Sequence, residues 1–289
     1  MKVLILGGAG MLGHRLWLNL RDRHDVWVTV RGTSHVFDDK FNYDSQRVIT
    51  QVNALRFDDV VRTIGTVQPD VVVNCIGVIK QHPLAKEAIP SLEINSVLPH
   101  RLAELCKAAR CRLIHISTDC VFSGKTGGYT EDDVSDAEDL YGRSKFLGEV
   151  HSERHVVTLR TSIIGPELHT HFGLLEWFLS QSGPVSGFQK AIYTGFTTDE
   201  LSRIIDMYVL PNDDLHGLYQ IASEPINKYE LLRLFNQHYH RDLTIGVNDE
   251  FMCDRSLNAD RFNAATGYNP PGWSAMVAAM AANNPYLKD

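Results

Sequence analysis

Tyr141 and Lys145 have the types and the spacing of an acid–base pair. Residues four apart on a helix lie on the same face, so the two side chains are expected to be neighbours. A tyrosine hydroxyl can protonate a forming alkoxide when its pKa, about 10 in a free side chain, falls towards neutrality. A lysine cation nearby favours the tyrosinate and so lowers that pKa. The pair therefore predicts proton transfer during reduction of a carbonyl group.

A second polar group stands upstream, at the end of an apolar stretch in Ser117-Thr118-Asp119. The hydroxyl of Thr118 is predicted to hydrogen-bond the reacting oxygen and to steady the tyrosine. Thr118 and Asp119 are both expected to contact the substrate. Thr118, Tyr141 and Lys145 together form the predicted catalytic set.

A glycine-rich turn near the start of the chain predicts the source of the hydride. Gly7, Gly10 and Gly13 fit GxxGxxG, and the turn lies between an apolar strand and a helix. Such glycines permit a tight turn, close approach of a pyrophosphate, and close packing of the helix on the strand. The sequence thus predicts a dinucleotide cofactor, whose nicotinamide ribose Lys145 can also hold. The predicted contacts in the turn are Gly7, Gly10, Met11, Leu12 and Gly13.

The residues after the second strand favour NADPH as the cofactor, with NADH as the alternative. NAD sites usually place an acidic residue there, whereas this chain has Arg31-Gly32-Thr33-Ser34. An arginine suits a 2′-phosphate. Asn53 and Ala54 are predicted to flank the adenine. Cys75, Ile76 and Gly77 are predicted to line the nicotinamide ribose.

The order of strands and helices predicts an α/β fold, a Rossmann-type doubly wound parallel sheet with a smaller mixed α/β substrate-binding lobe. We expect a cofactor domain over residues 1–165 and a substrate lobe over 166–289, with segments near 190–225 returning to the main domain. The expected strands are 2–6, 26–30, 47–51, 71–75, 113–117, 156–160 and 217–221, with short extended pieces at 185–188 and 191–193. The expected helices are 11–20, 57–67, 90–109, 140–151, 174–180, 199–208 and 229–239.

Composition narrows the class of protein. The 289 residues carry a net charge of −7, which argues against a nucleic-acid or acidic-membrane partner. The apolar runs are too short to span a bilayer, and residues 2–6 are interpreted as a strand, not a signal peptide. The five cysteines have no zinc-like spacing, so we predict no metal and a cytoplasmic location.

These motifs together resemble an extended short-chain dehydrogenase/reductase, and more closely the dTDP-4-dehydrorhamnose reductase group. The resemblance is specific to about residue 165 and looser beyond. It rests on the glycine turn, residues 117–124, 129–132 and 141–149, and Leu159-Arg160-Thr161-Ser162. It implies Thr118, Tyr141 and Lys145 as the triad, a nucleotide-linked 4-keto-6-deoxyhexose as substrate, activated deoxysugar biosynthesis as the setting, and a homodimer. In the lobe, Arg255 is the favoured phosphate contact, ahead of Arg203 and Lys228, and Trp177 and Phe188 are candidates for stacking.

Cys120 departs from this group, which usually has tyrosine at that position. Related epimerase/reductases place a cysteine there as an acid/base beside the ketone, in one group with a histidine before an apolar helix. His171 precedes such a helix here, so Cys120 with His171 is a candidate epimerase pair. The alternatives are therefore a bifunctional 3,5-epimerase/4-reductase and, from another class, a non-catalytic nucleotide-binding subunit like the regulatory subunit of methionine adenosyltransferase. A dehydratase usually has Thr-Asp-Glu, and the missing glutamate counts against that activity.

Overall fold

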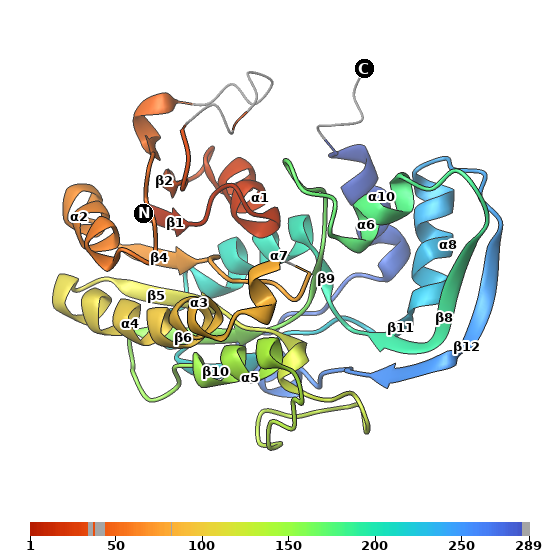
Figure 1. Cartoon of the computed structure of the whole chain (residues 1–289). Helices are drawn as coiled ribbons and strands as arrows, with labels where there is room; N and C mark the ends of the chain where they lie inside the picture. The colour runs from red at the N-terminus through yellow and green to blue at the C-terminus, as the bar shows by residue number, and fades with distance from the viewer. Residues whose placement is uncertain (34–36, 38–43, 82, 285–289) are drawn as a thin grey trace.

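The computed structural model describes residues 1–33, 37, 44–81 and 83–284 (Figure 1). Within them, a seven-stranded sheet has the order β3-β2-β1-β4-β5-β6-β10, and every neighbouring pair is parallel. This is the predicted doubly wound α/β fold, with the order reversing beside β1. The strands are β1 (Lys2–Leu6), β2 (Asp25–Thr29), β3 (Val48–Ile49), β4 (Val71–Asn74), β5 (Arg112–Ile116), β6 (Val156–Arg160) and β10 (Gly217–Gln220).

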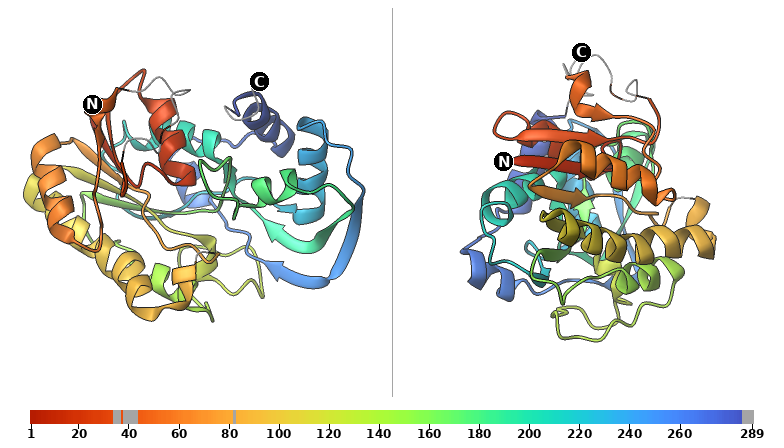
Figure 2. Two further views of the ribbon diagram at one scale, coloured as in Figure 1. Left: turned by 45° about the horizontal axis from the view of Figure 1, so that its top comes forward. Right: turned by 90° about the vertical axis from the view of Figure 1, so that its left-hand side faces the viewer.

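Helices cover both faces of this sheet, which explains why its strands are apolar without alternation. Val3 and Ile5 of β1 face one core, shared with α1 (Met11–Leu20) and α7 (Thr198–Ile204). Leu4 and Leu6 of the same strand face the other core, with α2 (Phe57–Val67) and α4 (Leu98–Ala109). Figure 2 shows the two helical layers on either side of the strands. All seven predicted strands are confirmed, with ends that agree within two residues.

A second, three-stranded sheet, β11-β8-β12, lies at the right of Figure 1 and packs against α8 (Lys228–His238). Its strands are β8 (Val185–Tyr193), β11 (Ile226–Asn227) and β12 (Ile245–Asp254), and two short strands, β7 (Ile163–Ile164) and β9 (Phe196–Thr197), pair separately. The expected short pieces at 185–188 and 191–193 are one strand, because β12 pairs with β8 along most of its length. β12 itself was not expected, since its polar residues hide the alternation typical of a strand.

The helices differ from expectation mainly at their ends. The predicted helix 90–109 consists of α3 (Ala88–Leu92), a π-helical turn at Glu93–Val97, and α4. The helix predicted to end at residue 151 is α5 (Leu140–Leu147), which stops where Gly148 lies against the backbone carbonyl of Asn95. The remaining helices are α6 (Leu174–Leu179), α9 (Asp260–Thr266) and α10 (Trp273–Ala282). No helix within the described residues is long and apolar enough to cross a membrane.

Candidate active site

The predicted site residues meet at the carboxyl ends of the parallel strands. Gly7 follows β1, Cys75 follows β4, and Thr118 follows β5 after one intervening residue. In open parallel sheets, ligands bind at this edge, where the strand order reverses. The topology therefore brings together segments that are more than 100 residues apart in the sequence.

The turn after β1 has no room for side chains on its inner side. A Cβ on Gly8 would overlap Val28, and a Cβ on Gly13 would lie 2.2 Å from the carbonyl oxygen of Gly7. Gly7 itself has a φ of +86°, which favours glycine. Gly10 is exposed and begins α1, so the first N–H groups of this helix face an open approach. The turn fits the pyrophosphate of a dinucleotide.

His14 lies buried in the first turns of α1 and makes stability depend on pH. Its Nδ1 lies 2.8 Å from the carbonyl oxygen of Gly10. Burial lowers its pKa from 6.5 to about 4, although the contact with Gly10 opposes the shift. The unfolded chain protonates His14 below about pH 6.5, whereas the folded chain protonates it only near pH 4. The free energy of unfolding therefore decreases as the pH is lowered from 6.5 to 4.

As the pH is lowered from 6.5 to 4, we expect this group to reduce the unfolding free energy of the wild type by about 3 kcal/mol. In His14→Gln, this part of the dependence of unfolding free energy on pH should be absent. Urea denaturation at several pH values measures it. The exposed His151→Asn serves as the control and keeps the wild-type slope. Equal slopes in His14→Gln and the wild type would contradict the assignment.

The other predicted cofactor residues surround the turn. Arg31, Gly32 and Thr33 are exposed beyond the end of β2, and Ser34 lies outside the described residues. Asn53 and Ala54 follow β3 and are half-buried. These positions leave the arginine side chain accessible to a phosphate.

The segment after β4 packs directly on the glycine turn. A Cβ on Gly7 would lie 3.0 Å from Ile76 and 3.3 Å from the backbone of Cys75. The N–H of Ile76 donates to the side chain of Asn74, and Gly77 is exposed. Burial raises the pKa of Cys75 to about 12, so this side chain is a neutral thiol near pH 7.

Tyr141 lies at the start of α5, and its neighbours explain why it is followed by glycine. Asp139 caps the helix by accepting from the N–H of Gly142 at 2.7 Å. A Cβ on Gly142 would lie 2.2 Å from the carbonyl oxygen of Cys120, so this contact needs glycine. Because α5 approaches so closely, the side chains of Tyr141 and Thr118 interact, and Thr118 acts to lower the pKa of the tyrosine. The first two members of the predicted triad are therefore in contact.

Lys145 is buried one turn further along α5, and its surroundings differ from the expectation. Its Nζ donates to the carbonyl oxygen of Ile116 at 2.8 Å. Burial lowers its pKa to about 8, opposed mainly by the charge of Glu149. Burial also raises the pKa of Tyr141, and among the described residues Lys145 is not one of the main groups acting on it. Lys145 therefore does not dominate the pKa of Tyr141, and its ammonium group lies beside Ile116 and Cys75, next to the glycine turn.

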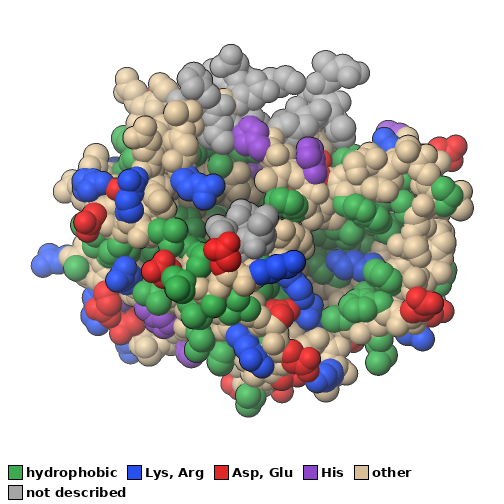
Figure 3. Space-filling model, viewed as in Figure 1, with side chains coloured by type: hydrophobic (Ala, Val, Ile, Leu, Met, Phe, Trp, Pro, Cys, Tyr) green, Lys and Arg blue, Asp and Glu red, His purple; other side chains and the backbone are tan. Residues whose placement is uncertain are grey.

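Two cations from the second half of the chain face the substrate side of Thr118. Arg255 follows β12 and is fixed by donation from its Nε to the carbonyl oxygen of Phe122 at 2.8 Å. Lys228 begins α8, and its Nζ lies 4.4 Å from the centre of the Tyr193 ring. The charges of Arg255 and Lys228 both act to lower the pKa of Asp119. Figure 3 shows that this face is hollowed beside the β8 and α8 region, with basic and hydrophobic side chains in the hollow.

Cys120 lies at this site, but His171 does not accompany it. Burial, together with the charge of Asp119, raises the pKa of the Cys120 thiol to about 12, while Arg255 opposes the shift. The side chain of His171 is 77% exposed, and its Nδ1 lies 3.7 Å from Glu176. Among the described residues, the cations that act on the pKa of Asp119 are Arg255 and Lys228, and Arg255 also acts on the pKa of Cys120. The structure therefore does not bring the candidate epimerase pair together.

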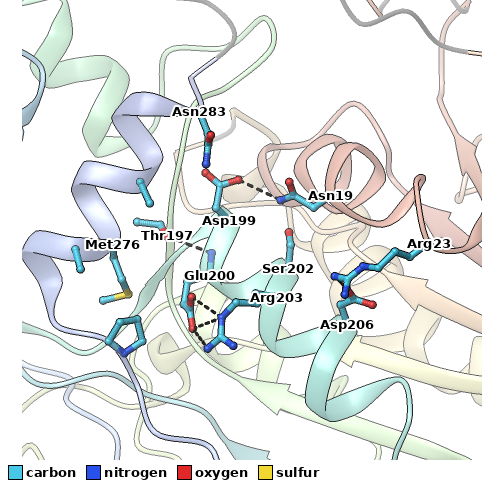
Figure 4. Close-up of a pocket in the computed structure, with 13 residues that line it drawn as sticks. Asn19, Arg23, Thr197, Asp199, Glu200, Ser202, Arg203, Asp206, Met276 and Asn283 are labelled. Carbon is cyan, nitrogen blue, oxygen red and sulfur yellow. Dashed lines mark hydrogen bonds and ion pairs between the residues drawn. The ribbon is translucent and has the colours of Figure 1, made fainter.

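Of the remaining candidates, Arg203 belongs to a different pocket, shown in Figure 4. This pocket, of about 430 Å³, lies between α7 and α10, and there Arg203 pairs with Glu200 at 2.7 Å. Trp177 and Phe188 are both more than one-third exposed. Phe188 packs against Phe251, with ring centroids 5.2 Å apart.

Two features of the site were missed from the sequence. Glu149 and Arg160 form a buried ion pair of 2.7 Å that also receives the hydroxyl of Ser117. Tyr193 packs under Lys228 from the end of β8. The spacing Lys145-x-x-x-Glu149 gave a signal for the first feature, whereas the second depends on the pairing of distant strands.

Comparison with known proteins identifies the family of the chain. The family model described as RmlD substrate binding domain matches residues 1–173. The dTDP-4-dehydrorhamnose reductase of Streptomyces griseus is 32% identical over 147 residues, which are 50% of this chain and 43% of that protein. The methionine adenosyltransferase 2 subunit beta of Mus musculus is 30% identical over 148 residues, 51% of this chain and 41% of that protein. The chain thus matches less than half the length of these relatives.

Solved structures extend the likeness over the whole chain. The dTDP-4-dehydrorhamnose reductase of Bacillus anthracis, solved in complex with NADP, superposes with a TM-score of 0.80 and 17% identity. The match covers 98% of this chain and 99% of that one. At this identity the likeness shows the fold.

Proposed function

The chain belongs to the RmlD substrate binding domain family of extended short-chain dehydrogenases/reductases, and on that premise we propose that it uses NADPH to reduce a nucleotide-diphospho-4-keto-6-deoxyhexose at the 4-keto group. The observation that carries this proposal is the meeting of the glycine turn with the interacting side chains of Thr118 and Tyr141 at one edge of the sheet. Reductases named among the relatives, and a structural neighbour holding NADP, support it.

Each residue has a role that follows from its place. The bound cofactor supplies the hydride. Thr118 holds the carbonyl oxygen of the sugar, and Tyr141 donates the proton that the forming alkoxide takes up. Lys145, turned to the cofactor side, holds the nicotinamide ribose. Arg255 binds the diphosphate, since an arginine fixed by a backbone carbonyl presents its remaining donors in a set direction.

The division of labour follows the two parts of the chain. Residues 1–165 bind the cofactor through the turn after β1 and the segments after β2, β3 and β4. Residues 166–289 supply the substrate side with Lys228 and Arg255, except that β10 returns to the main sheet. A homodimer remains a prediction from the family.

Arg31 tests the choice of cofactor. Arg31→Gln removes the cation proposed for the 2′-phosphate, so KM for NADPH rises about 10-fold or more while KM for NADH changes little, since a charge-assisted hydrogen bond contributes about 1.5–3 kcal/mol. Steady-state kinetics with both cofactors measures the ratio. The exposed Arg154→Gln is the matched control and keeps the wild-type preference. An equal change for both cofactors would show that Arg31 does not read the phosphate.

Epimerisation before reduction is the second candidate, and the half-buried Cys120 beside Tyr141 favours it. In D₂O, a plain 4-reductase gives a product without ring deuterium, whereas an epimerase/reductase leaves deuterium at C3 or C5. NADPH oxidation with dTDP- and UDP-4-keto-6-deoxyglucose, followed by NMR of the product, separates the two. Turnover with neither sugar would count against the proposed reduction of these substrates.

A further inference from the structure

Asp119 is a buried acid that the triad alone does not explain. The residue is only 6% exposed. The hydroxyl of Thr118 donates to its Oδ1 at 3.2 Å, and the N–H of Cys120 donates to the Thr118 oxygen at 3.2 Å. A hydroxyl has one donor and two acceptor sites. When Asp119 holds its proton, the same contact lets the carboxyl donate to Thr118, while the Thr118 hydroxyl donates to Tyr141, whose pKa it acts to lower. The three side chains then form one line that runs from Asp119 to Tyr141.

The groups around Asp119 suit an acid that gives up and regains a proton. Burial raises the pKa of Asp119, so this carboxyl holds its proton more strongly than an exposed aspartate. Arg255 and Lys228 face it from the second half of the chain and lower the pKa, which stabilises the carboxylate once the proton has left. The other titratable groups that act with it are Cys120, Tyr141 and Tyr193.

On the basis of the reduction proposed above, we propose that Asp119 reprotonates Tyr141 through the hydroxyl of Thr118. When Tyr141 has given its proton to the alkoxide, the tyrosinate takes the hydroxyl proton of Thr118, and Thr118 takes the carboxyl proton of Asp119. Each O–H bond that breaks is matched by one that forms, and no electron is transferred. The carboxylate that remains faces two cations and regains its proton from solvent.

This line of groups differs from transfer through the lysine of the triad. The Nζ of Lys145 donates to the carbonyl oxygen of Ile116, beside Cys75 and away from Asp119. Lys145 therefore serves the cofactor, while the proton reaches Tyr141 from the substrate side. Lys228, which the sequence placed among phosphate contacts, acquires a further role in setting how readily Asp119 is ionised.

The isosteric Asp119→Asn tests the proposal by kinetics. We expect kcat to fall about 100-fold, the size of a proton-transfer contribution, with KM for the sugar nearly unchanged. The relay needs protonated Asp119, so wild-type kcat declines as the pH rises through the pKa of this group, and the variant lacks that decline. Formate should restore part of the activity of Asp119→Ala. Asp249→Asn, at an exposed position on β12, is the matched control and behaves as the wild type.

Infrared difference spectroscopy of the protein without cofactor gives a second readout that does not depend on turnover. The carbonyl band of a buried carboxylic acid should be present in the wild type and lost in Asp119→Asn. Lys228→Met should move the titration of this band to higher pH, because the lysine charge lowers the pKa of Asp119. The absence of the band, or wild-type kcat and pH profile in Asp119→Asn, overturns the proposal. If the wild type shows the band but no 4-keto sugar supports NADPH oxidation, the proposed reduction is refuted instead.

Discussion

Tyr141→Phe is expected to lower kcat at least about 1000-fold while leaving the affinity for NADPH within about twofold of the wild type. The hydroxyl that this change removes is the proposed proton donor, and general acid catalysis contributes about 100- to 10,000-fold. Cofactor affinity is retained because the turn after β1 and Lys145 are untouched. Stopped-flow NADPH oxidation and fluorescence titration of the cofactor measure the two quantities.

Tyr219→Phe is the matched control for this experiment. Tyr219 lies on the edge strand β10, where its ring contacts Phe262, so the control removes a hydroxyl far from the triad. A Tyr141→Phe protein with wild-type turnover would remove the tyrosine from the chemistry. A wild type without any turnover, with an effect on a partner enzyme that Tyr141→Phe preserves, would favour the regulatory alternative suggested by the methionine adenosyltransferase relatives.

Glu149→Gln is expected to destabilise the folded chain by about 3–5 kcal/mol. The side chains of Glu149 and Arg160 are 0% and 2% exposed, and they share two hydrogen bonds of 2.7 and 2.8 Å. Removing one member of such a buried pair leaves the other charge without compensation, which costs far more than the pair itself contributes. Ser117 also loses its charged acceptor. Urea denaturation followed by circular dichroism measures the loss.

The pair of Lys125 and Glu138 provides the control, because both side chains are about 70% exposed. Glu138→Gln should leave the unfolding free energy close to the wild-type value, because exposed pairs contribute little to stability. A loss of similar size in the two variants would show that the Glu149 pair is solvated in the folded protein.

The main sheet could be predicted because its signals are local. The strand Lys2–Leu6 is apolar throughout, and the glycines after it are required by contacts within a few residues or with the next strand. Once the strand order is Rossmann-like, the strand ends bring Gly7, Cys75 and Thr118 to one edge whatever the remaining details are. The cofactor side of the candidate site was therefore predictable.

The substrate side was harder because it depends on the pairing of distant segments. Nothing near Lys228 in the sequence shows that α8 begins beside Tyr193, since this follows from the pairing of β11 with β8. The position of Arg255 likewise follows from β12, whose polar residues concealed the strand. His171 was chosen by its place before an apolar helix, and this place does not specify which way the side chain points. The helix period correctly put Tyr141 and Lys145 on one helix but could not show that burial, not the lysine charge, dominates the tyrosine pKa.

Transfer of the cofactor hydride to the sugar is the most direct test of the central claim. The protein would be incubated with NADPH carrying deuterium at both C4 hydrogens of the nicotinamide and with dTDP- or UDP-4-keto-6-deoxyglucose in H₂O, and the sugar product analysed by NMR. Deuterium at C4 of the sugar, absent from the Tyr141→Phe reaction, is the predicted result. A sugar that remains a ketone, or a product whose C4 carries no deuterium while NADPH is consumed, would contradict the account.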